Sequence, residues 1–171
     1  MAKLNNIVMF ACNQGGHFSQ MMVLKDLFEK YDSVLVTDNV RATKTMLALR
    51  FIDNIEIIKG ESTKRKKVKS SEKGSRISFL GVYVHMLFES IKIWNKYRPK
   101  VIISTGSNIA VPLFFIGKLK GSKIIYIETR AKVYARSMTG ILVRHIADHI
   151  FVQWPEMLSL YPEAEYCGTL V

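Results

Sequence analysis

A glycine turn followed by a histidine is the first segment of the chain that could do chemistry. Gly15-Gly16-His17 comes directly after an apolar run, where a buried strand would turn into a helix. Glycines let a backbone approach a ligand closely, and a helix N-terminus favours an anion such as pyrophosphate. An imidazole exchanges protons near neutral pH, so His17 is a candidate to accept a proton from an attacking hydroxyl. The alternative is a histidine that only caps or hydrogen-bonds the turn.

The same turn also admits a dinucleotide interpretation. Asp38 follows the next predicted strand, at roughly the distance expected of a ribose-binding acid. The turn lacks the full G-x-G-x-x-G spacing, however. The sequence therefore does not support a dinucleotide fingerprint.

A second turn of this kind follows residues 101–104, which are apolar or small and favour a buried strand. An apolar run after the turn predicts a helix, with Ser107 or Asn108 as its cap and Pro112 close to its first turn. The N–H groups at such a helix start have no intrahelical partner and suit a phosphate or carboxylate. The alternative is a turn that only closes a strand–helix unit.

Glu128 is the third candidate, because it directly follows the apolar residues 124–127. A carboxylate at the end of a strand is a hydroxyl-binding group, a base, or half of an ion pair, and Arg130 is the candidate partner for such a pair. Both substrate contact and structural pairing stay open. The sequence contains no recognisable Ser-His-Asp arrangement, Walker loop or paired catalytic carboxylates.

The elements that must position these residues alternate along the chain. The pattern predicts six or seven strands alternating with helices, and so a Rossmann-like, doubly wound, mostly parallel α/β sheet. In that architecture ligands lie outside the carboxyl ends of the strands. The polar residues expected at that rim are His17, Asp38, Thr105, Glu128 and Trp154. The predicted strands are 6–11, 33–37, 54–59, 101–104, 123–127 and 149–153, and the predicted helices are 18–30, 41–51, 77–97, one beginning near 108, 138–146, and a short one from 154 to about 161.

Composition limits the class of protein. We expect a single domain over the 171 residues, long enough to bury about two-thirds of its unfolded surface. Cys12 and Cys167 have no ligand-like spacing to any histidine, which argues against a metal site and for a reducing compartment. No segment fits a signal peptide or a membrane span, so we expect a soluble or peripheral protein. The formal net charge of +11 calls for an anionic partner.

Much of this charge lies in residues 59–76, which hold eight Lys or Arg residues against two Glu. This basic segment is either a solvated loop or a contact for anionic lipid, where each basic residue contributes about 1 kcal/mol. The helix 77–97 that follows has two apolar stripes, although covering a sheet needs only one. The second stripe is expected to pack on a neighbouring helix, or to meet a bilayer or a partner chain. The expected membrane contacts are Lys64, Arg65, Lys66, Lys67, Lys69 and Phe79.

Taken together, several segments resemble a known family. The chain resembles the anchor subunit of the eukaryotic dolichol-linked N-acetylglucosaminyltransferase, and it is similar to bacterial capsule and exopolysaccharide proteins of the CpsF and PssD type. More distantly it looks like the N-terminal half of the peptidoglycan transferase MurG. The segments that carry the resemblance are Gly15-Gly16-His17, Thr105-Gly106-Ser107 with Pro112, Tyr126-Ile127-Glu128, 147–155 (ADHIFVQWP) and 161–168 (YPEAEYCG).

The resemblance implies the acceptor-binding, membrane-recruiting half of a split, inverting GT-B transferase that moves a sugar from a UDP-sugar to a lipid-pyrophosphate saccharide. A small Rossmann-like partner would bind the donor and carry most of the activity, so this chain would need no metal and no tightly bound cofactor. The implied location is the cytoplasmic face of the cell membrane, without a nucleic-acid partner. The implied roles are catalytic for His17 and Glu128, acceptor or phosphate binding for Gly15, Gly16, Ser19, Thr105, Gly106, Ser107 and Arg130, and partner contact for Trp154, Tyr166 and Gly168.

Two departures from the family matter. The eukaryotic anchor subunit has an N-terminal membrane helix that this sequence does not show, and the second Rossmann-like domain of a GT-B enzyme would have to come from another polypeptide. Two other functions remain open. One is a non-catalytic module that attaches a complex to membranes, and the other is a stand-alone Rossmann enzyme that uses a nucleotide.

Overall fold

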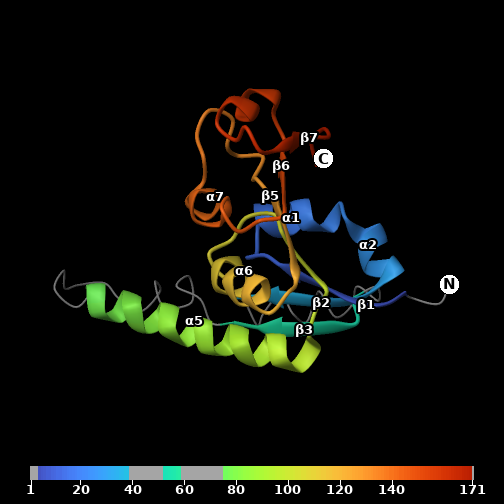
Figure 1. Cartoon of the computed structure of the whole chain (residues 1–171), viewed down its shortest axis with the longest axis vertical. Coiled ribbons are helices and arrows are strands. Elements are labelled where there is room, and N and C mark those ends of the chain that lie inside the picture. The colour runs from blue at the N-terminus through green and yellow to red at the C-terminus, as the bar shows by residue number, and fades with distance from the viewer. Residues whose placement is uncertain (1–3, 39–51, 59–74, 171) are drawn as a thin grey trace.

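A computed structural model describes residues 4–38, 52–58 and 75–170 (Figure 1). The predicted helix 41–51 lies outside the described residues. So does the basic segment up to residue 74, with Lys64, Arg65, Lys66, Lys67 and Lys69. Phe79 falls within a described helix, but its side chain is outside the description.

Seven parallel strands form one sheet in the order β3-β2-β1-β4-β5-β6-β7. The strand order reverses between β1 and β4, so the segments that follow these two strands leave the sheet next to each other. A crevice outside the carboxyl ends of the strands at this reversal is the usual ligand site of such a sheet. The strands are β1 (Leu4–Ala11), β2 (Tyr31–Thr37), β3 (Asn54–Ile57), β4 (Val101–Ser104), β5 (Lys123–Ile127), β6 (His149–Val152) and β7 (Glu165–Tyr166).

Helices cover both faces of the sheet, as Figure 1 shows for α1 and α2 on one side and α5 on the other. Successive strand residues point to opposite faces, so Met9 packs in the core beneath α5, α6 and α7, whereas Phe10 packs in the core beneath α1 and α2. This confirms the predicted doubly wound fold. The helices are α1 (Gly16–Met22), α2 (Lys25–Lys30), α5 (Ser75–Tyr97), α6 (Ala110–Leu119), α7 (Met138–Val143) and the 3-10 helix η1 (Pro155–Ser159).

Three predicted helices differ from the structure. The predicted helix 18–30 is two helices, because tighter turns at Val23 and Leu24 break the α-helical hydrogen bonding. The break directs α2 so that Phe28 stacks on Phe10, with 3.8 Å between ring centroids. The helix expected over 138–146 ends at Val143, and the short helix after β6 is a 3-10 helix that begins at Pro155. The two-residue strand β7 has no counterpart among the predicted ranges.

The long helix α5 was predicted almost to the residue, and the structure separates its two apolar stripes. Val82, Met86 and Ile93 are buried in the core. On the other stripe, Leu87 and Phe88 remain 40% and 60% exposed. No helix of the described residues is both long enough and apolar enough to cross a bilayer.

Candidate functional site

His17 is held against the turn after β4 by two hydrogen bonds. Its Nδ1 lies 2.9 Å from the backbone oxygen of Thr105, and the Thr105 hydroxyl donates to the backbone oxygen of His17 over 2.8 Å. A backbone carbonyl can only accept, so Nδ1 carries the hydrogen and the lone pair of the neutral ring lies on Nε2. The histidine is therefore oriented as a base. It also hydrogen-bonds the turn, as one of the two alternatives predicted, whereas its role as a base stays a prediction.

Glycines make this close approach between the two turns possible. Gly15 precedes α1 with a φ of 90°, and Gly106 follows β4 with a φ of 93°, a region that other residues rarely adopt. A Cβ atom on Gly106 would lie 3.1 Å from Cε1 of His17 and 3.7 Å from the Tyr126 hydroxyl. Gly106 thus leaves room for the imidazole above β4 and β5.

The turn after β4 is fastened to the end of β1 rather than capping the next helix. The Ser107 hydroxyl donates to the side-chain oxygen of Asn13, whose amide donates to Asn108 over 3.0 Å. α6 begins at Ala110 with Ile109 as its N-cap residue and without a side-chain cap. The predicted cap at Ser107 or Asn108 is therefore wrong, because both side chains are engaged with Asn13, although Ser107 also accepts from the Ile109 amide over 3.3 Å.

Glu128 is fully buried and accepts four hydrogen bonds. Its Oε1 accepts from the Tyr126 hydroxyl (2.9 Å) and the Thr129 amide (2.8 Å). Its Oε2 accepts from the Tyr161 hydroxyl (2.7 Å) and the Ser137 amide (3.1 Å). These four donors occupy the lone pairs of the carboxylate. The predicted ion pair with Arg130 is wrong, since hydroxyls and amides satisfy Glu128 within the described residues.

Tyr126 and Tyr161 both stay protonated and donate their hydroxyl hydrogens to Glu128. Burial, and then the nearby charge of Glu128, raise the pKa of Tyr126 far above its usual range. Burial, and then its hydrogen bond to Glu128, raise the pKa of Tyr161 in the same way. The two hydroxyls therefore remain donors at neutral pH.

A pair of glutamines, which the sequence analysis did not single out, joins three parts of the chain. Gln20 Oε1 accepts from the Arg130 amide (3.1 Å) and from Gln153 Nε2 (2.6 Å). Gln153 Nε2 also donates to the backbone oxygen of Glu128, and its Oε1 accepts from the Leu170 amide. In the sequence, Gln153 was the last residue of the predicted strand 149–153 and lay within the segment 147–155 that carries the resemblance, whereas nothing marked Gln20.

The other predicted site residues fall into two groups, those near His17 and those at the β7 edge of the sheet. Ser19 is exposed, and its hydroxyl donates to Gly15 within the same helix turn. Trp154 donates its indole N–H to the backbone oxygen of Arg130 over 2.8 Å. Tyr166 and Gly168 lie at the β7 edge of the sheet, away from the reversal between β1 and β4. His17 thus lies beside Gly15, Gly16 and the turn 105–107, and Arg130 is connected to its helix through Gln20.

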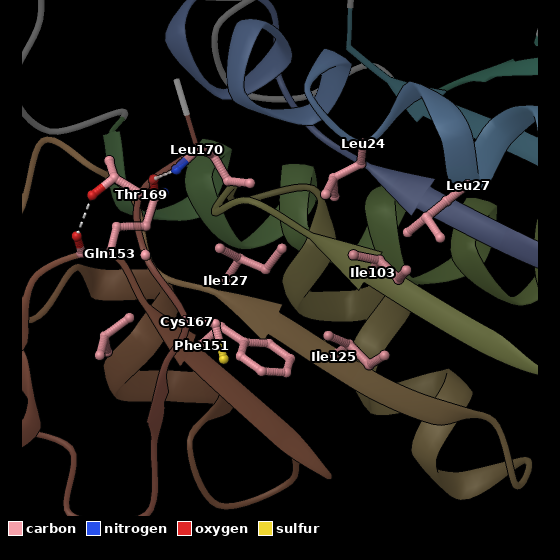
Figure 2. A pocket seen from close by; sticks show the side chains of 12 residues that line it. Leu24, Leu27, Ile103, Ile125, Ile127, Phe151, Gln153, Cys167, Thr169 and Leu170 are labelled. Carbon is pink, nitrogen blue, oxygen red and sulfur yellow. Dashed lines mark hydrogen bonds between the residues drawn. The ribbon is translucent and has the colours of Figure 1, made fainter.

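An apolar pocket of about 280 Å³ lies on the α1/α2 face of the sheet, against β4, β5 and β6 (Figure 2). Leu24 and Leu27 form one side, Ile125 and Phe151 belong to its strands, and residues 167–170 border it. Parallel strands normally have both faces covered. No group of three or more potential metal ligands gathers among the described residues.

Comparison with known proteins gives the family. Residues 8–170 match the family described as "Oligosaccharide biosynthesis protein Alg14 like". The UDP-N-acetylglucosamine transferase subunit ALG14 of Kluyveromyces lactis is 28% identical over an alignment of 193 positions, gaps included, which covers 99% of this chain and 80% of that protein. The subunit of the same name from Candida albicans is 33% identical over 70% of this chain and 62% of its own length. The human one is 29% identical over 52% of this chain and 44% of its own length.

Solved structures agree with the fold. MurG of Acinetobacter baumannii superposes with a TM-score of 0.68 at 13% identity, over 97% of this chain and 46% of MurG. The UDP-GlcNAc 2-epimerase of Methanocaldococcus jannaschii superposes with a TM-score of 0.65 at 12% identity, over 95% of this chain and 45% of the epimerase. The chain thus spans less than half of each of these proteins and shares its fold with that part. Because the family match extends over nearly every residue, the chain belongs to the Alg14-like family of oligosaccharide biosynthesis proteins.

Proposed function

We propose that this chain is the acceptor-binding subunit of a split glycosyltransferase. The complete enzyme moves a sugar from a UDP-sugar to a lipid-pyrophosphate-linked saccharide, and a separate polypeptide holds the donor. One fact supports this: family members are named as subunits of a UDP-N-acetylglucosamine transferase. From the predicted resemblance to CpsF and PssD proteins, we propose capsule or exopolysaccharide synthesis as the setting of the reaction.

The single observation that carries this proposal is the orientation of His17 at the reversal of strand order. With Nδ1 bound to Thr105, the Nε2 lone pair is free to accept the proton of an acceptor hydroxyl. The hydroxyl oxygen attacks the anomeric carbon, the bond from that carbon to the UDP oxygen breaks, and the proton remains on Nε2. UDP leaves with the bonding electron pair, and one displacement inverts the anomeric configuration.

The acceptor phosphates bind at the two glycine turns beside His17. Gly15 is the N-cap residue of α1, Gly16 is its first residue, and the turn 105–107 lies between β4 and α6. Backbone amides and small side chains therefore line this part of the rim. Arg130 supplies a cation, and Ser19 lies one helical turn from Gly15. Glu128 is the weaker of the two predicted bases, because all of its lone pairs are occupied, and we assign it a positioning role.

The apolar pocket on the sheet supports the proposal that a partner subunit binds there. The pocket on β4, β5 and β6 is apolar and bordered by the C-terminal residues 167–170, and Tyr166 beside it is 43% exposed. A partner that covers this face would complete the second layer of a parallel sheet. Trp154, Tyr166 and Gly168 remain the proposed partner contacts.

Recruitment to the cytoplasmic side of a membrane rests on charge and on exposed apolar side chains. The chain carries a net charge of +11, and the basic segment includes Lys64 to Lys69. Leu87 and Phe88 on α5 and Phe115 on α6 are exposed, and they belong to neighbouring helices. The same observation favours one alternative function, a non-catalytic module that only attaches a transferase to the membrane.

Reconstitution tests the proposal. The chain is co-expressed with a candidate donor-binding subunit, and transfer from a panel of UDP-sugars to a lipid-pyrophosphate-linked N-acetylglucosamine is measured. His17→Ala should lower kcat by roughly 10²–10⁴-fold, the usual contribution of a general base. His85→Ala, at an exposed position on α5, is the matched control. If His17→Ala turns over at the wild-type rate, His17 is not the base; if the wild-type chain changes only membrane attachment and not kcat, the chain is the attachment module.

A further inference from the structure

One buried carboxylate holds both ends of the loop 129–137, which connects β5 to α7. The amide of Thr129, the first residue of the loop, donates to Oε1 of Glu128 over 2.8 Å, and the amide of Ser137, the last, donates to Oε2 over 3.1 Å. The two ends of the loop therefore lie on either side of a single carboxylate. Tyr126 and Tyr161 fill the remaining positions of Glu128, which fixes its orientation.

The close packing around this carboxylate leaves little freedom for other arrangements. Ser137 is the N-cap of α7, accepts from the Gly140 amide and is hydrogen-bonded to the Tyr126 hydroxyl over 2.9 Å. A Cβ atom on Gly140 would lie 1.9 Å from the Tyr161 hydroxyl and 2.6 Å from Glu128 Oε2. The exit of the loop is thus fixed by contacts that tolerate no side chain at this glycine.

The start of the loop lies against the helix that carries His17. The Arg130 amide donates to the side chain of Gln20, three residues after His17, over 3.1 Å. Gln20 Nε2 lies 3.5 Å from Thr129 Oγ1 and donates to the backbone oxygen of Gly16 over 3.1 Å. The loop therefore borders the proposed acceptor site.

The middle of the loop presents cations and an aromatic ring to solvent. Arg130 and Lys132 are exposed, Tyr134 is 80% exposed, and the loop contains no acidic residue. Neither Arg130 nor Lys132 takes part in an ion pair within the described parts of the chain. Arg136 differs, because its guanidinium donates to the Leu160 oxygen and lies 5.2 Å from the centroid of the Tyr161 ring.

We propose that the loop 129–137 binds the pyrophosphate and the sugar of the acceptor, and that Glu128 is the positioning residue that holds the loop in place. This inference rests on the proposed function and names residues for it. Arg130 and Lys132 bind the phosphates, because a guanidinium and an ammonium form strong charge-assisted hydrogen bonds with phosphate oxygens. Tyr134 packs its flat apolar face on the sugar ring and offers its hydroxyl to the sugar hydroxyls. An exposed aromatic ring beside two cations suits a ligand that is both anionic and a saccharide.

Two soluble probes separate the parts of this proposal: citronellyl pyrophosphate, and the same compound carrying N-acetylglucosamine on its terminal phosphate. Trp154 reports binding by fluorescence, since its indole donates to Arg130 in the loop. The chain has two tryptophans, so Trp94→Phe leaves Trp154 as the sole reporter. The wild-type chain should bind both probes, and the saccharide probe more tightly.

Tyr134→Ala should weaken binding of the saccharide probe about tenfold and leave citronellyl pyrophosphate unchanged, since stacking contributes only with the sugar present. Tyr134→Phe should restore most of that loss. Arg130→Ala and Lys132→Ala should each weaken both probes. A protein with merely damaged structure would lose both probes in parallel in every variant, which overturns the assignment of Tyr134.

Glu128→Gln tests the positioning role, because its amide nitrogen cannot accept a hydrogen bond from Thr129 or Ser137. We expect both probes to bind more weakly, and the amide proton signals of residues 129 and 137 to move upfield in NMR spectra. Glu156→Gln is the control, since it removes the charge of an exposed carboxylate on η1 that lies outside this network. Should Glu128→Gln not fold, the Tyr134→Ala and Tyr134→Phe pair still decides on the loop.

The outcomes also separate this inference from the proposed function. If the wild-type chain binds both probes and the loop variants bind them equally well, the loop assignment is overturned while the acceptor role stands. If the wild-type chain binds neither probe, the acceptor role itself is overturned.

Discussion

At the scale of single residues, the site depends on positions where a side chain is excluded. Gly106 combines a φ of 93° with a Cβ position 3.1 Å from the imidazole of His17. Gly121, after α6, has a φ of 85° and no atom within 4 Å of its Cβ position. The two glycines have the same backbone requirement, but only one of them touches the proposed base.

This pair gives a matched prediction. Gly106→Ala and Gly121→Ala should each destabilise the protein by about 1–2 kcal/mol, the cost of a left-handed conformation for an L-residue. Only Gly106→Ala should also lower the transfer rate of the reconstituted enzyme, because its methyl group displaces His17. Urea unfolding measures the first effect and steady-state kinetics the second. Equal transfer rates for the two variants would show that the position of His17 does not matter.

The tyrosines around Glu128 predict how stability depends on pH. A tyrosine with a raised pKa in the folded state stabilises the protein fully below about pH 10, and this contribution is lost as pH rises, because only the unfolded chain can release the proton. The pKa values of Tyr126 and Tyr161 are raised by burial and by Glu128. The free energy of unfolding should therefore begin to fall near pH 10 and continue to fall as pH rises further.

The loss should be shallower in Tyr161→Phe, which has one fewer tyrosine to release a proton on unfolding. Urea unfolding across this pH range measures the slope, and absorbance at 295 nm counts the ionised phenols. At least two of the seven tyrosines should remain protonated until the protein unfolds, and burial also raises the pKa of Tyr97. Ionisation of all seven in the folded protein would contradict the buried network.

At the scale of elements, the sequence predicts what is local and misses what is distant. Apolar runs and glycine turns were enough to predict six strands and the long helix, because each pattern lies within one segment. β7 was missed because its two residues are held by backbone bonds to β6, which no local pattern records. The hydrogen bonds that Glu128 accepts from Ser137 and Tyr161 could not be predicted for the same reason, since these residues lie 9 and 33 residues further along the chain.

Helix packing on the sheet gives a second matched pair. A Cβ atom on Gly117 of α6 would lie 2.4 Å from Cδ1 of Ile102 and 3.2 Å from Cδ1 of Ile124, whereas Gly81 of α5 is exposed with open space around it. Alanine favours a helix over glycine by about 1 kcal/mol, but overpacking costs about 1–3 kcal/mol. Gly117→Ala should therefore destabilise the protein and Gly81→Ala should stabilise it. Urea unfolding measures both, and a stabilised Gly117→Ala would show that α6 can shift away from the sheet.

We predict that the outer face of α5 contacts a membrane. Phe88 is 60% exposed, and a groove lined by one tyrosine, Tyr83, and otherwise by apolar side chains, among them Leu87 and Phe115, lies between α5 and α6. Phe88→Ser should reduce co-sedimentation with vesicles that contain phosphatidylglycerol, because exposed apolar side chains and basic residues bind such surfaces together. Leu158→Ser, at a 38% exposed position on η1, is the control. Equal loss in both variants would mean that α5 is not the contact.

At the scale of the whole molecule, the site and the apolar pocket on the sheet are connected. The C-terminal residues return to the site, where Thr169 and Leu170 hydrogen-bond to Gln153 (Figure 2), and Gln153 is bonded in turn to Gln20 on the helix of His17. A partner that binds along residues 167–170 would thus contact the network that fixes the proposed base. Composition alone could not predict this, since it depends on two glutamines 133 residues apart.

The two cysteines let this arrangement be measured directly. Cys167 is exposed and borders the apolar pocket, whereas Cys12 is buried, and burial raises the pKa of its thiol, so it stays protonated and unreactive. The folded chain should react with one equivalent of a thiol reagent such as Ellman's reagent, and the urea-unfolded chain with two.

A donor-binding subunit that covers β4, β5 and β6 should slow the reaction of Cys167. Leu27→Asp, which places a charge in the pocket, should restore fast labelling by preventing assembly, whereas Phe88→Ser on the opposite face should not. Fast labelling of Cys167 within an active complex would show that the partner binds elsewhere.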